Sequence, residues 1–298
     1  MSAIPDDRPV ALVTGHQGFI GRALYPELSD LGWQVSGLTD DNGLAVDLRD
    51  AEAVRAAIIR LRPQVILHLG GVSGPMQLAG DSASILRINV EGTQTVLDSA
   101  ALNDVPRVML AGSVAGYAVC GPDGPEPESL YGLTKRVVEH QARLWTRSTG
   151  GSATILRIGS VYGPGRTSVN PMHDMVEMAL TEGVIRVAPH RMEPCIEIRS
   201  CARLIASLTR VPAWRMRYDL VTDRPHSVEV ATLIAEMTGA AVQVQEEDRA
   251  YPTFPEDFDP APLMSDTKQN SLTSLKEGLA GVIDAYRNTI RKTAVHAN

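Results

Sequence analysis

The sequence predicts an α/β fold, a doubly wound parallel sheet with a smaller, less regular α/β region after it. In the first half, short apolar runs such as 9–15 and 107–111 alternate with helical patterns. Uninterrupted apolar strands are typical of parallel sheets that helices cover on both faces. The alternation stops at a glycine- and proline-rich loop, 163–165. We therefore expect one domain at 1–165 and a smaller substrate-binding domain at 166–298.

The first domain is expected to consist of strands joined by helices. The crossover connections between its parallel strands should be right-handed. The apolar runs that predict strands are 9–15, 33–38, 64–69, 107–111 and 153–158. The segments with apolar residues at helical spacing are 18–31, 51–61, 82–102 and 131–146.

The second domain has weaker patterns. A short strand is expected at 218–221, and Ser227 is expected to be the N-cap of a helix. A segment rich in Pro, Asp and Glu follows at 246–262. The helices expected in this half are 172–180, 199–208 and 227–237.

Composition excludes several classes of protein. The chain has 298 residues, 44% of them hydrophobic, and a formal net charge of −7. A nucleic-acid-binding surface needs clustered Lys and Arg, so we expect no nucleic-acid partner. No stretch approaches the roughly 20 apolar residues that span a bilayer, and a start containing Asp6 and Asp7 does not indicate a signal peptide. We expect a cytoplasmic protein without a metal site, whose cysteines Cys120, Cys195 and Cys201 are free thiols.

A glycine-rich turn predicts a dinucleotide-binding site on a Rossmann-type fold. It lies between the first strand and the first helix, where such folds bind a pyrophosphate. Gly15 permits the tight turn, Gly18 lets the backbone approach the phosphates, and Gly21 lets the helix pack closely. The helix N-terminus adds unpaired N–H groups and a partial positive charge. The glycines alone would also suit a plain tight turn. The expected cofactor contacts here are Gly15, Gln17, Gly18, Phe19, Ile20 and Gly21.

Tyr131, Lys135 and Ser113 are the candidate catalytic group. Tyr131 and Lys135 lie one helical turn apart, so they share one helix face. The pKa of a free tyrosine is about 10, and a nearby ammonium group favours its phenolate. Tyr131 would then exchange a proton with an alcohol while a hydride moves to or from nicotinamide. Ser113 follows a strand, at the edge where open α/β sheets bind ligands.

These motifs resemble those of the short-chain dehydrogenase/reductase superfamily, and most of all its extended branch, the NAD-dependent epimerase/dehydratase family. The glycine spacing is G-x-x-G-x-x-G, the catalytic pair is Y-x-x-x-K, and 156–165 resembles L-R-x-x-N-V-Y-G-P-G. The resemblance covers essentially the whole chain. It implies that Ser113 orients the reacting oxygen, that Lys135 also holds the nicotinamide ribose, and that Ile158 contacts the cofactor.

The resemblance also locates the adenosine end of the cofactor. A carboxylate after the second strand would accept both ribose hydroxyls of NAD and repel the 2′-phosphate of NADP. Thr39 occupies the family's usual acid position, and Asp40 follows it. We expect no Arg or Lys near this strand end, so NAD is favoured over NADP. Alternatively, Asp40 belongs to a polar turn. Further expected contacts are Asp47 and Leu48 at the adenine edge and Leu69, Gly70 and Gly71 along the cofactor.

Asn89 and Gly92 lie inside an expected long helix, where both residue types are locally unfavourable. Segment 89–93 resembles the family's N-V-x-G-T run, whose Asn serves the backbone and supports the active site. We therefore count Asn89 among the catalytic residues with Ser113, Tyr131 and Lys135.

Two positions depart from the sugar-nucleotide enzymes of this family. Ser160 replaces their usual Asn, and Glu193 falls where an Arg would meet a diphosphate. A carboxylate would repel that group, although Arg191 or Arg199 could substitute for the missing cation. The residues directly after Ser113 lack the Asp and Glu of dehydratases, so 4,6-dehydration is not expected.

Four other residues have both a functional and a structural interpretation. We interpret His173 and His190 as surface histidines rather than substrate contacts. Cys120 is interpreted as a buried small side chain rather than an acid or base in an epimerisation. Arg157 is interpreted as a structural ion-pair partner rather than a substrate ligand.

The predicted function is NAD(P)-dependent hydride transfer between nicotinamide and a sugar or polyol-like secondary alcohol or ketone. A dehydrogenase would release reduced cofactor in each turnover, whereas a nucleotide-sugar epimerase would retain NAD. The lost diphosphate features favour a dehydrogenase or reductase. A non-catalytic, cofactor-binding regulatory protein is the alternative from another class, and the intact catalytic group argues against it. The resemblance implies a homodimer that pairs helices 82–102 and 131–146.

Overall fold

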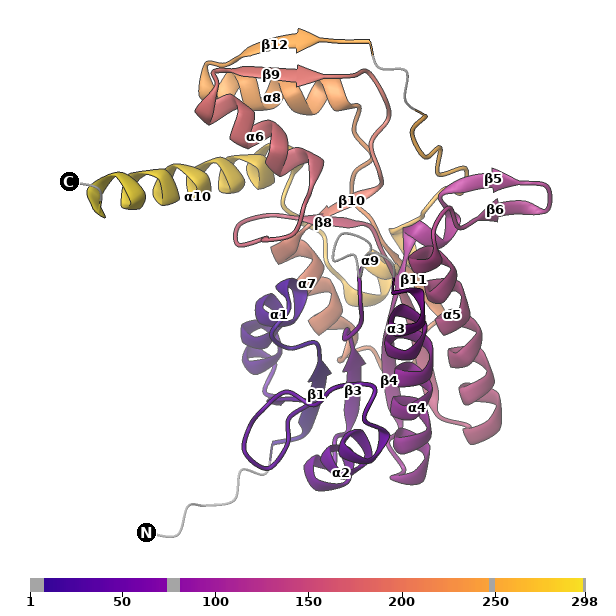
Figure 1. Ribbon diagram of the computed structural model, residues 1–298. Coiled ribbons are helices and arrows are strands. Elements are labelled where there is room, and N and C mark those ends of the chain that lie inside the picture. Colours follow the sequence, from indigo (N-terminus) through magenta and orange to yellow (C-terminus); the bar gives the residue numbers. More distant parts are fainter. Residues whose placement is uncertain (1–7, 74–80, 247–249, 297–298) are drawn as a thin grey trace.

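The computed structural model describes residues 8–73, 81–246 and 250–296 (Figure 1). Asp6 and Asp7, which bear on the signal-peptide prediction, lie outside this range. The centre is a six-stranded sheet in the order β11-β7-β4-β3-β1-β2, with every pair parallel. Its strands are β1 (Val10–Thr14), β2 (Gln34–Gly37), β3 (Val65–His68), β4 (Arg107–Ser113), β7 (Ser152–Ile158) and β11 (Arg217–Leu220).

The strand order places a ligand crevice at one point of the sheet. From β1 the chain moves to β2 at the edge, then crosses back to β3 on the other side of β1. Where the direction of winding reverses in this way, the connections leave a crevice at the carboxyl ends of the strands. The crevice therefore lies beyond β1 and β3, where the glycine-rich turn and residues 69–71 follow.

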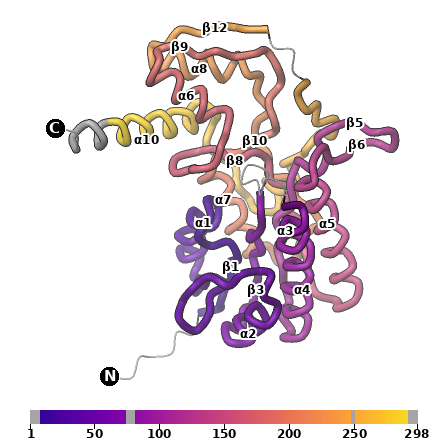
Figure 2. Tube along the Cα trace, in the orientation of Figure 1, coloured from indigo at the N-terminus to yellow at the C-terminus, as the bar shows by residue number. Residues whose placement is uncertain are grey.

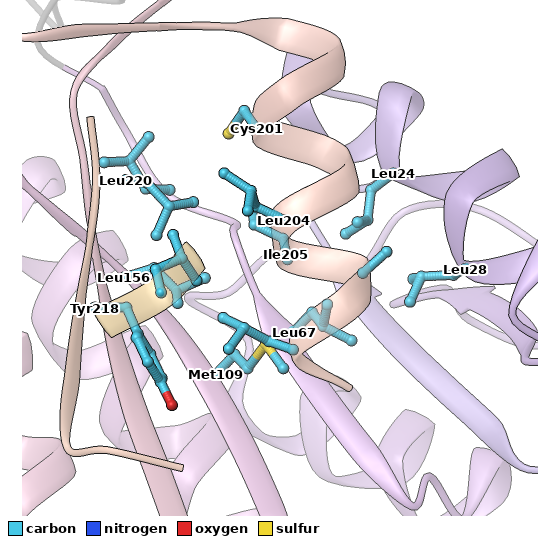
Figure 3. Close-up of a cluster of buried hydrophobic side chains, with 14 of the residues drawn as sticks. Leu24, Leu28, Leu67, Met109, Leu156, Cys201, Leu204, Ile205, Tyr218 and Leu220 are labelled. Carbon is cyan, nitrogen blue, oxygen red and sulfur yellow. The ribbon is translucent and has the colours of Figure 1, made fainter. Parts of the chain in front are cut away.

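Helices cover both faces of the sheet, which confirms the doubly wound arrangement. Figure 3 shows one face, where Leu24 and Leu28 of α1 and Leu204 of α7 meet Leu67, Leu156 and other strand side chains. The other face has a second apolar cluster. The covering helices are α1 (Phe19–Asp30) and α7 (Ile198–Leu208) on the first face, and α2 (Ala51–Leu61), α4 (Gly92–Leu102) and α5 (Leu130–Thr149) on the second.

The expected helix at 82–102 is not uniform. It consists of α3 (Ser82–Leu86), a π-helical turn at Arg87–Glu91, and α4. Single π turns inside α-helices are frequent at functional sites. Here the wide turn contains Asn89, whose side chain bonds to a neighbouring backbone segment.

The later part of the chain forms a separate layered cluster, at the top of Figure 1. It holds the parallel pair of β9 (Val184–Val187) and β12 (Ala241–Val244), packed with α6 (Pro171–Thr181), α8 (Ser227–Thr238) and α10 (Leu275–His296). A second parallel pair, β8 (Ser160–Tyr162) and β10 (Cys195–Glu197), lies between this cluster and the sheet (Figure 2). The division at residue 165 stays a proposal, because α7 and β11 lie beyond it and belong to the layers of the main sheet.

Several elements, most of them in this half, were not expected from the sequence. The N-cap of α8 is His226, so the prediction of Ser227 is wrong; the Ser227 hydroxyl donates to the Ala188 carbonyl instead. Helix α10 was not predicted, although its buried residues recur at helical spacing. The other elements not predicted are α9 (Ala261–Thr267), the hairpin of β5 (Val119–Gly121) and β6 (Gly124–Glu126), and strands β8, β9, β10 and β12.

Two further properties of the described residues concern membranes and metal ions. None of their helices has both the length and the apolar composition needed to cross a bilayer. They contain no group of three or more His, Cys, Asp or Glu side chains arranged to hold a metal ion.

Candidate active site

A cavity of about 500 Å³ opens at the carboxyl ends of β1, β3, β4 and β7. It joins the glycine-rich turn to the three candidate catalytic side chains, which are far apart in the sequence. The predicted site residues that line it are Gly15, Gln17, Gly18, Phe19, Ile20, Gly21, Leu69, Gly70, Gly71, Ser113, Tyr131, Lys135 and Ile158.

The glycine-rich turn has the geometry of a pyrophosphate cradle. Gly15 has φ of +68°, and a Cβ there would lie 2.8 Å from the Gly70 nitrogen. A Cβ on Gly21 would lie 2.3 Å from the Gly15 carbonyl oxygen, so both positions exclude a side chain. The N-cap of α1 is Gly18, which offers no side-chain acceptor to the first N–H groups of the helix. Such free N–H groups beside an open backbone fit an anionic phosphate group.

Tyr131 and Ser113 face each other in the cavity. Tyr131 sits in the first turn of α5, whose N-cap Ser129 accepts a hydrogen bond from Gly132 N–H at 3.1 Å. Burial raises the pKa of Tyr131 to about 12, a hydrogen bond with Ser113 lowers it, and the charge of Glu193 raises it further. The Ser113 hydroxyl also accepts from the Ala115 N–H at 3.2 Å. The phenol is therefore protonated at neutral pH unless another positive charge approaches it.

Lys135 is buried beside this pair. Its ammonium group donates to the Ala111 carbonyl at 2.9 Å and lies 5.6 Å from the centre of the Tyr131 ring. Burial lowers the pKa of Lys135 to about 8. The ammonium is thus held over the end of β4, close to Tyr131 and to Gly71, which lines the cavity.

Asn89 does not line the cavity, in contrast to its expected place in the catalytic group. Its Oδ1 accepts from the Val72 N–H at 2.8 Å, and its Nδ2 donates to the Val72 carbonyl and the Thr134 hydroxyl, both at 3.0 Å. The Thr134 hydroxyl in turn donates to the Tyr131 carbonyl at 2.7 Å. Asn89 therefore acts on the site by positioning the start of α5 relative to the segment after β3.

The adenosine-side residues do not line the cavity either. Asp40 accepts from the N–H groups of Asn42 and Leu44, at 2.9 and 2.8 Å, so it closes the polar turn given above as the alternative. Asp47 pairs with Arg49. Leu48 packs where side chains on Gly70 and Gly92 would fall. Their cofactor contacts remain predictions.

An arginine lies near the end of β2, so the expectation of no Arg or Lys there is wrong. Arg60 donates to the Thr39 carbonyl and pairs with Asp41. It comes from the last turn of α2, which the fold brings back to this strand end, so neighbouring positions in the sequence do not reveal it. The paired Asp41 offsets its charge.

Two histidines are buried and neutral. His68, at the end of β3, lies between the hydroxyls of Thr14 and Thr93, at 2.8 and 3.0 Å. Burial lowers its pKa to about 3. Burial also lowers the pKa of His173 to about 4, and this residue packs edge-on against Tyr286. The interpretation of His173 as a surface histidine is therefore wrong.

The remaining candidates resolve in different ways. His190 is half-buried and stacks on Tyr251, with ring centres 3.6 Å apart. Cys120 is exposed on β5, so its interpretation as a buried side chain is wrong; Cys195 and Cys201 are buried, and all three are free. Arg157 is a structural ion-pair partner, as interpreted: it is buried and pairs with Glu139 at 2.8 Å and with Glu256 at 2.6 Å.

The second wall of the cavity comes from the segments around β8 and β10. Ser160, Arg166 and Glu193 all line it. Glu193 is open to the cavity but has protein on its other sides, and this desolvation raises its pKa to about 7, against the effect of Arg166. Arg166 was not predicted, although it directly follows the family-like G-P-G.

Arg191 and Arg199 do not supply the missing cation. Neither lines the cavity. Arg191 donates to the Arg224 carbonyl at 2.9 Å, and Arg199 lies 3.5 Å from the Glu197 carboxylate. The proposed substitution by either residue is therefore wrong for this structure.

The parallel sheet, the glycine-rich turn and the Ser113, Tyr131 and Lys135 group define a short-chain dehydrogenase/reductase of the extended type. A model of the NAD dependent epimerase/dehydratase family matches residues 11–197, and the chain belongs to this family. It is an enzyme of the NAD-dependent, extended short-chain dehydrogenase/reductase type.

Two curated relatives illustrate the range of activities in this family. The dTDP-L-rhamnose 4-epimerase of Burkholderia thailandensis is 26% identical over 298 residues, covering 77% of this chain and 81% of that protein. The uronate dehydrogenase of Agrobacterium fabrum is 31% identical over 165 residues, covering 50% of this chain and 60% of that protein.

Solved structures confirm the fold over nearly the whole chain. The UDP-glucose 4-epimerase of Thermus thermophilus, in complex with NAD, has a TM-score of 0.76 at 22% identity and covers 93% of this chain and 99% of its own. An NAD-dependent NDP-hexosamine 5,6-dehydratase has a TM-score of 0.80 at 19% identity, with 94% and 98% coverage.

Proposed function

We propose that the protein transfers a hydride between NAD and a secondary alcohol or ketone of a sugar or polyol-like substrate, with Tyr131 as the acid and base. One observation supports this most strongly: the Ser113, Tyr131 and Lys135 side chains line the same cavity as the glycine-rich turn. A cofactor held at the turn would therefore extend toward the phenol.

The residues at the strand ends and at the start of α5, which form the first wall of the cavity, would each have a separate role. The turn at 15–21 would hold the pyrophosphate on the N-terminus of α1. NAD, when bound, supplies the hydride-accepting ring and a positive charge. Ser113 would orient the reacting oxygen, and Tyr131 would take up or donate its proton. Lys135, fixed by the Ala111 carbonyl, would hold the nicotinamide ribose and favour the phenolate.

NAD is proposed over NADP on the adenosine side. Asp40 and Asp41 carry negative charge beside the end of β2, and Arg60 is already paired with Asp41. A 2′-phosphate would meet two carboxylates and no unpaired cation among these three residues. Asp47 and Leu48 are proposed to contact the adenine.

A dehydrogenase or reductase is proposed over an epimerase. The carboxylate of Glu193 opens into the cavity, where it would oppose a diphosphate. One relative is named a uronate dehydrogenase, and that name gives a sugar acid without a nucleotide as the substrate. A nucleotide-sugar epimerase that retains NAD is the second candidate. It is favoured because the similarity to the dTDP-L-rhamnose 4-epimerase extends over 81% of that protein.

Replacing Tyr131 with Phe tests catalysis. The variant removes one oxygen, so NAD should still bind, while turnover falls at least hundredfold because the acid–base group is lost. NAD binding is followed by fluorescence titration and turnover by absorbance of reduced cofactor, with sugars, uronic acids, polyols and sugar nucleotides as substrates. Net reduction of NAD identifies a dehydrogenase, and a changed sugar configuration without net reduction identifies an epimerase. A wild-type protein that binds NAD and turns over none of these alcohols would instead support the regulatory alternative.

A homodimer is proposed from the exposed surface of the two long helices. Leu86 of α3, Leu102 of α4, and Leu133 and Leu144 of α5 are exposed apolar side chains. Pairing of these helices between two chains would cover them. Replacing Leu144 with Glu should convert the dimer to a monomer in sedimentation analysis.

A cytoplasmic location is proposed from the three free thiols.

A further inference from the structure

The carboxylate of Glu193 is exposed and faces the cavity. In the described part of the chain, its side chain has no hydrogen bond or ion pair, although it lines the cavity with Tyr131 and Ser113. Arg166, the cation nearest to it on this wall, donates to the carbonyls of Val161, Ser168 and Val169 instead. A carboxylate held beside the reacting groups without a protein donor is available to accept a hydrogen bond from a ligand.

Ser160, on the same wall, has a defined hydrogen-bond polarity. The Asn170 side chain is buried as the N-cap of α6, and its Oδ1 accepts from the Met172 N–H at 3.0 Å. Its Nδ2 therefore faces Ser160 and donates to the Ser160 hydroxyl oxygen at 3.2 Å. An amide nitrogen accepts no hydrogen bond, so the hydroxyl hydrogen of Ser160 stays free to donate.

The pairing of β8 with β10 brings the backbone of Ser160 next to the residue that follows Glu193. The Ser160 N–H donates to the Pro194 carbonyl at 2.7 Å, directly after Glu193 in the chain. The wall therefore presents a hydroxyl donor from Ser160 and a carboxylate acceptor from Glu193 to the same cavity. A donor and an acceptor on one wall match two oxygens of a polyhydroxylated carbon chain, one accepting from Ser160 and one donating to Glu193.

We infer that Glu193 and Ser160 form the specificity-determining pair of this cavity, selecting a free polyhydroxylated substrate and rejecting one that carries phosphate at this position. The inference rests on the proposed function for the identity of the reacting end. It extends that function by assigning the contacts: Glu193 accepts from a substrate hydroxyl, and Ser160 donates to another oxygen of the substrate. A diphosphate diester has no donor for Glu193, and its charge is repelled by the ionised carboxylate, the form that prevails above pH 7.

The charged and titratable groups that act with Glu193 come from three elements. Tyr131 belongs to α5, Arg166 to the loop after β8, and Cys195 to β10. Lys135 lines the same cavity and has a pKa of about 8. The pKa of Glu193 is about 7, so it loses its negative charge as the pH falls from 8 to 6. Repulsion of a phosphate should weaken over that interval.

Binding of UDP-glucose to the NAD-loaded protein tests the repulsion without relying on turnover. Its diphosphate is a diester whose charge is constant between pH 6 and 8. We expect Glu193→Gln to bind UDP-glucose at least tenfold more tightly than the wild type at pH 8 in calorimetry. The difference should shrink toward pH 6, while Lys135 titrates equally in both proteins. Glu236→Gln, an exposed residue of α8 paired with Lys276, changes the net charge equally and should behave as the wild type.

Glu193→Leu tests the hydroxyl contact. This side chain has a similar size and no acceptor, so the KM for a free sugar or polyol substrate should rise at least tenfold while NAD affinity stays unchanged. Equal UDP-glucose affinity of wild type and Glu193→Gln at pH 8, or a KM of Glu193→Leu within twofold of the wild type, would overturn the inference. A wild type that turns over no alcohol at all would instead overturn the proposed function, and the binding comparison would still decide whether Glu193 repels phosphate.

Discussion

The two walls of the cavity are built in different ways. The first wall comes from the ends of neighbouring strands of one sheet and from the start of α5, and two of its candidate catalytic side chains are buried: Ser113 and Lys135 are 7% and 8% exposed. The second wall comes from loops around the short pair β8 and β10, and Glu193 is open to the cavity without a protein partner among the described residues. Rigid placement suits the hydride-transfer step, which needs accurate geometry, whereas open polar groups suit the recognition of a substrate.

The largest effect is expected from Arg157→Met, because Arg157 is a buried charge that links three segments of the fold. It is 3% exposed and joins β7 to Glu139 of α5 and to Glu256 from late in the chain. Its removal leaves Glu139 buried without its main counter-charge, which should lower the free energy of unfolding by about 3–5 kcal/mol. Urea unfolding measures this. Arg186→Met breaks an exposed pair with Glu182 and should cost about 0–1 kcal/mol; equal losses in the two variants would refute the difference.

Gly21→Ala should weaken NAD binding about a hundredfold, roughly 3 kcal/mol. The new Cβ would lie 2.3 Å from the Gly15 carbonyl oxygen, so the pyrophosphate cradle must open. Calorimetric titration with NAD measures the loss. Gly281→Ala, in α10, meets only the end of the flexible Arg199 side chain and the Pro164 ring at 3.3 Å or more, and should leave NAD binding unchanged. Normal NAD affinity in Gly21→Ala would show that the turn does not hold the cofactor.

The smallest effect is the change of stability with pH that two buried histidines cause, His68 in the main sheet and His173 in α6. Their pKa values, about 3 for His68 and about 4 for His173, lie below the unfolded value near 6.5. Above pH 6.5 both histidines are neutral in the folded and the unfolded chain, so their titration does not change stability. As the pH falls below 6.5, the unfolded chain binds protons that the folded chain does not, so each histidine should lower stability by up to about 1.4 kcal/mol per pH unit.

The variant His173→Phe keeps a ring against Tyr286 and removes the titration. Its unfolding free energy, followed by urea titration between pH 7 and 4.5, should therefore fall less steeply than that of the wild type. Parallel pH curves for the two proteins would contradict a neutral buried His173.

Local sequence patterns predicted the strands and the first wall of the cavity well, because each signal is contained in one short segment. The turn at 15–21 and the pair Tyr131 and Lys135 line the cavity as expected, and the strands differ from the predicted ranges by at most two residues at either end. Burial is not a local property, however. Cys120 proved exposed and His173 buried, since exposure depends on which elements pack over a residue.

Contacts between distant segments account for most of the wrong or missing predictions. Arg60 reaches the end of β2 only because α2 folds back toward it. Arg166 lines the cavity because its loop returns to β8, where the guanidinium donates to the Val161 carbonyl. Asn89 illustrates an intermediate case. Its unfavourable place in a helix indicated a special role, and its side chain forms hydrogen bonds with Val72 and Thr134.

The class of fold, the glycine-rich turn and the candidate catalytic group could be predicted from local sequence, because these depend on residue type at fixed short spacing. Only the folded chain shows which polar groups share the cavity with them. The hydrogen-bond polarity of Ser160 depends on Asn170, and the free carboxylate of Glu193 depends on where Arg166 bonds. These relations arise from packing between segments, and the energies that select them are those of burial and hydrogen bonding in the assembled fold.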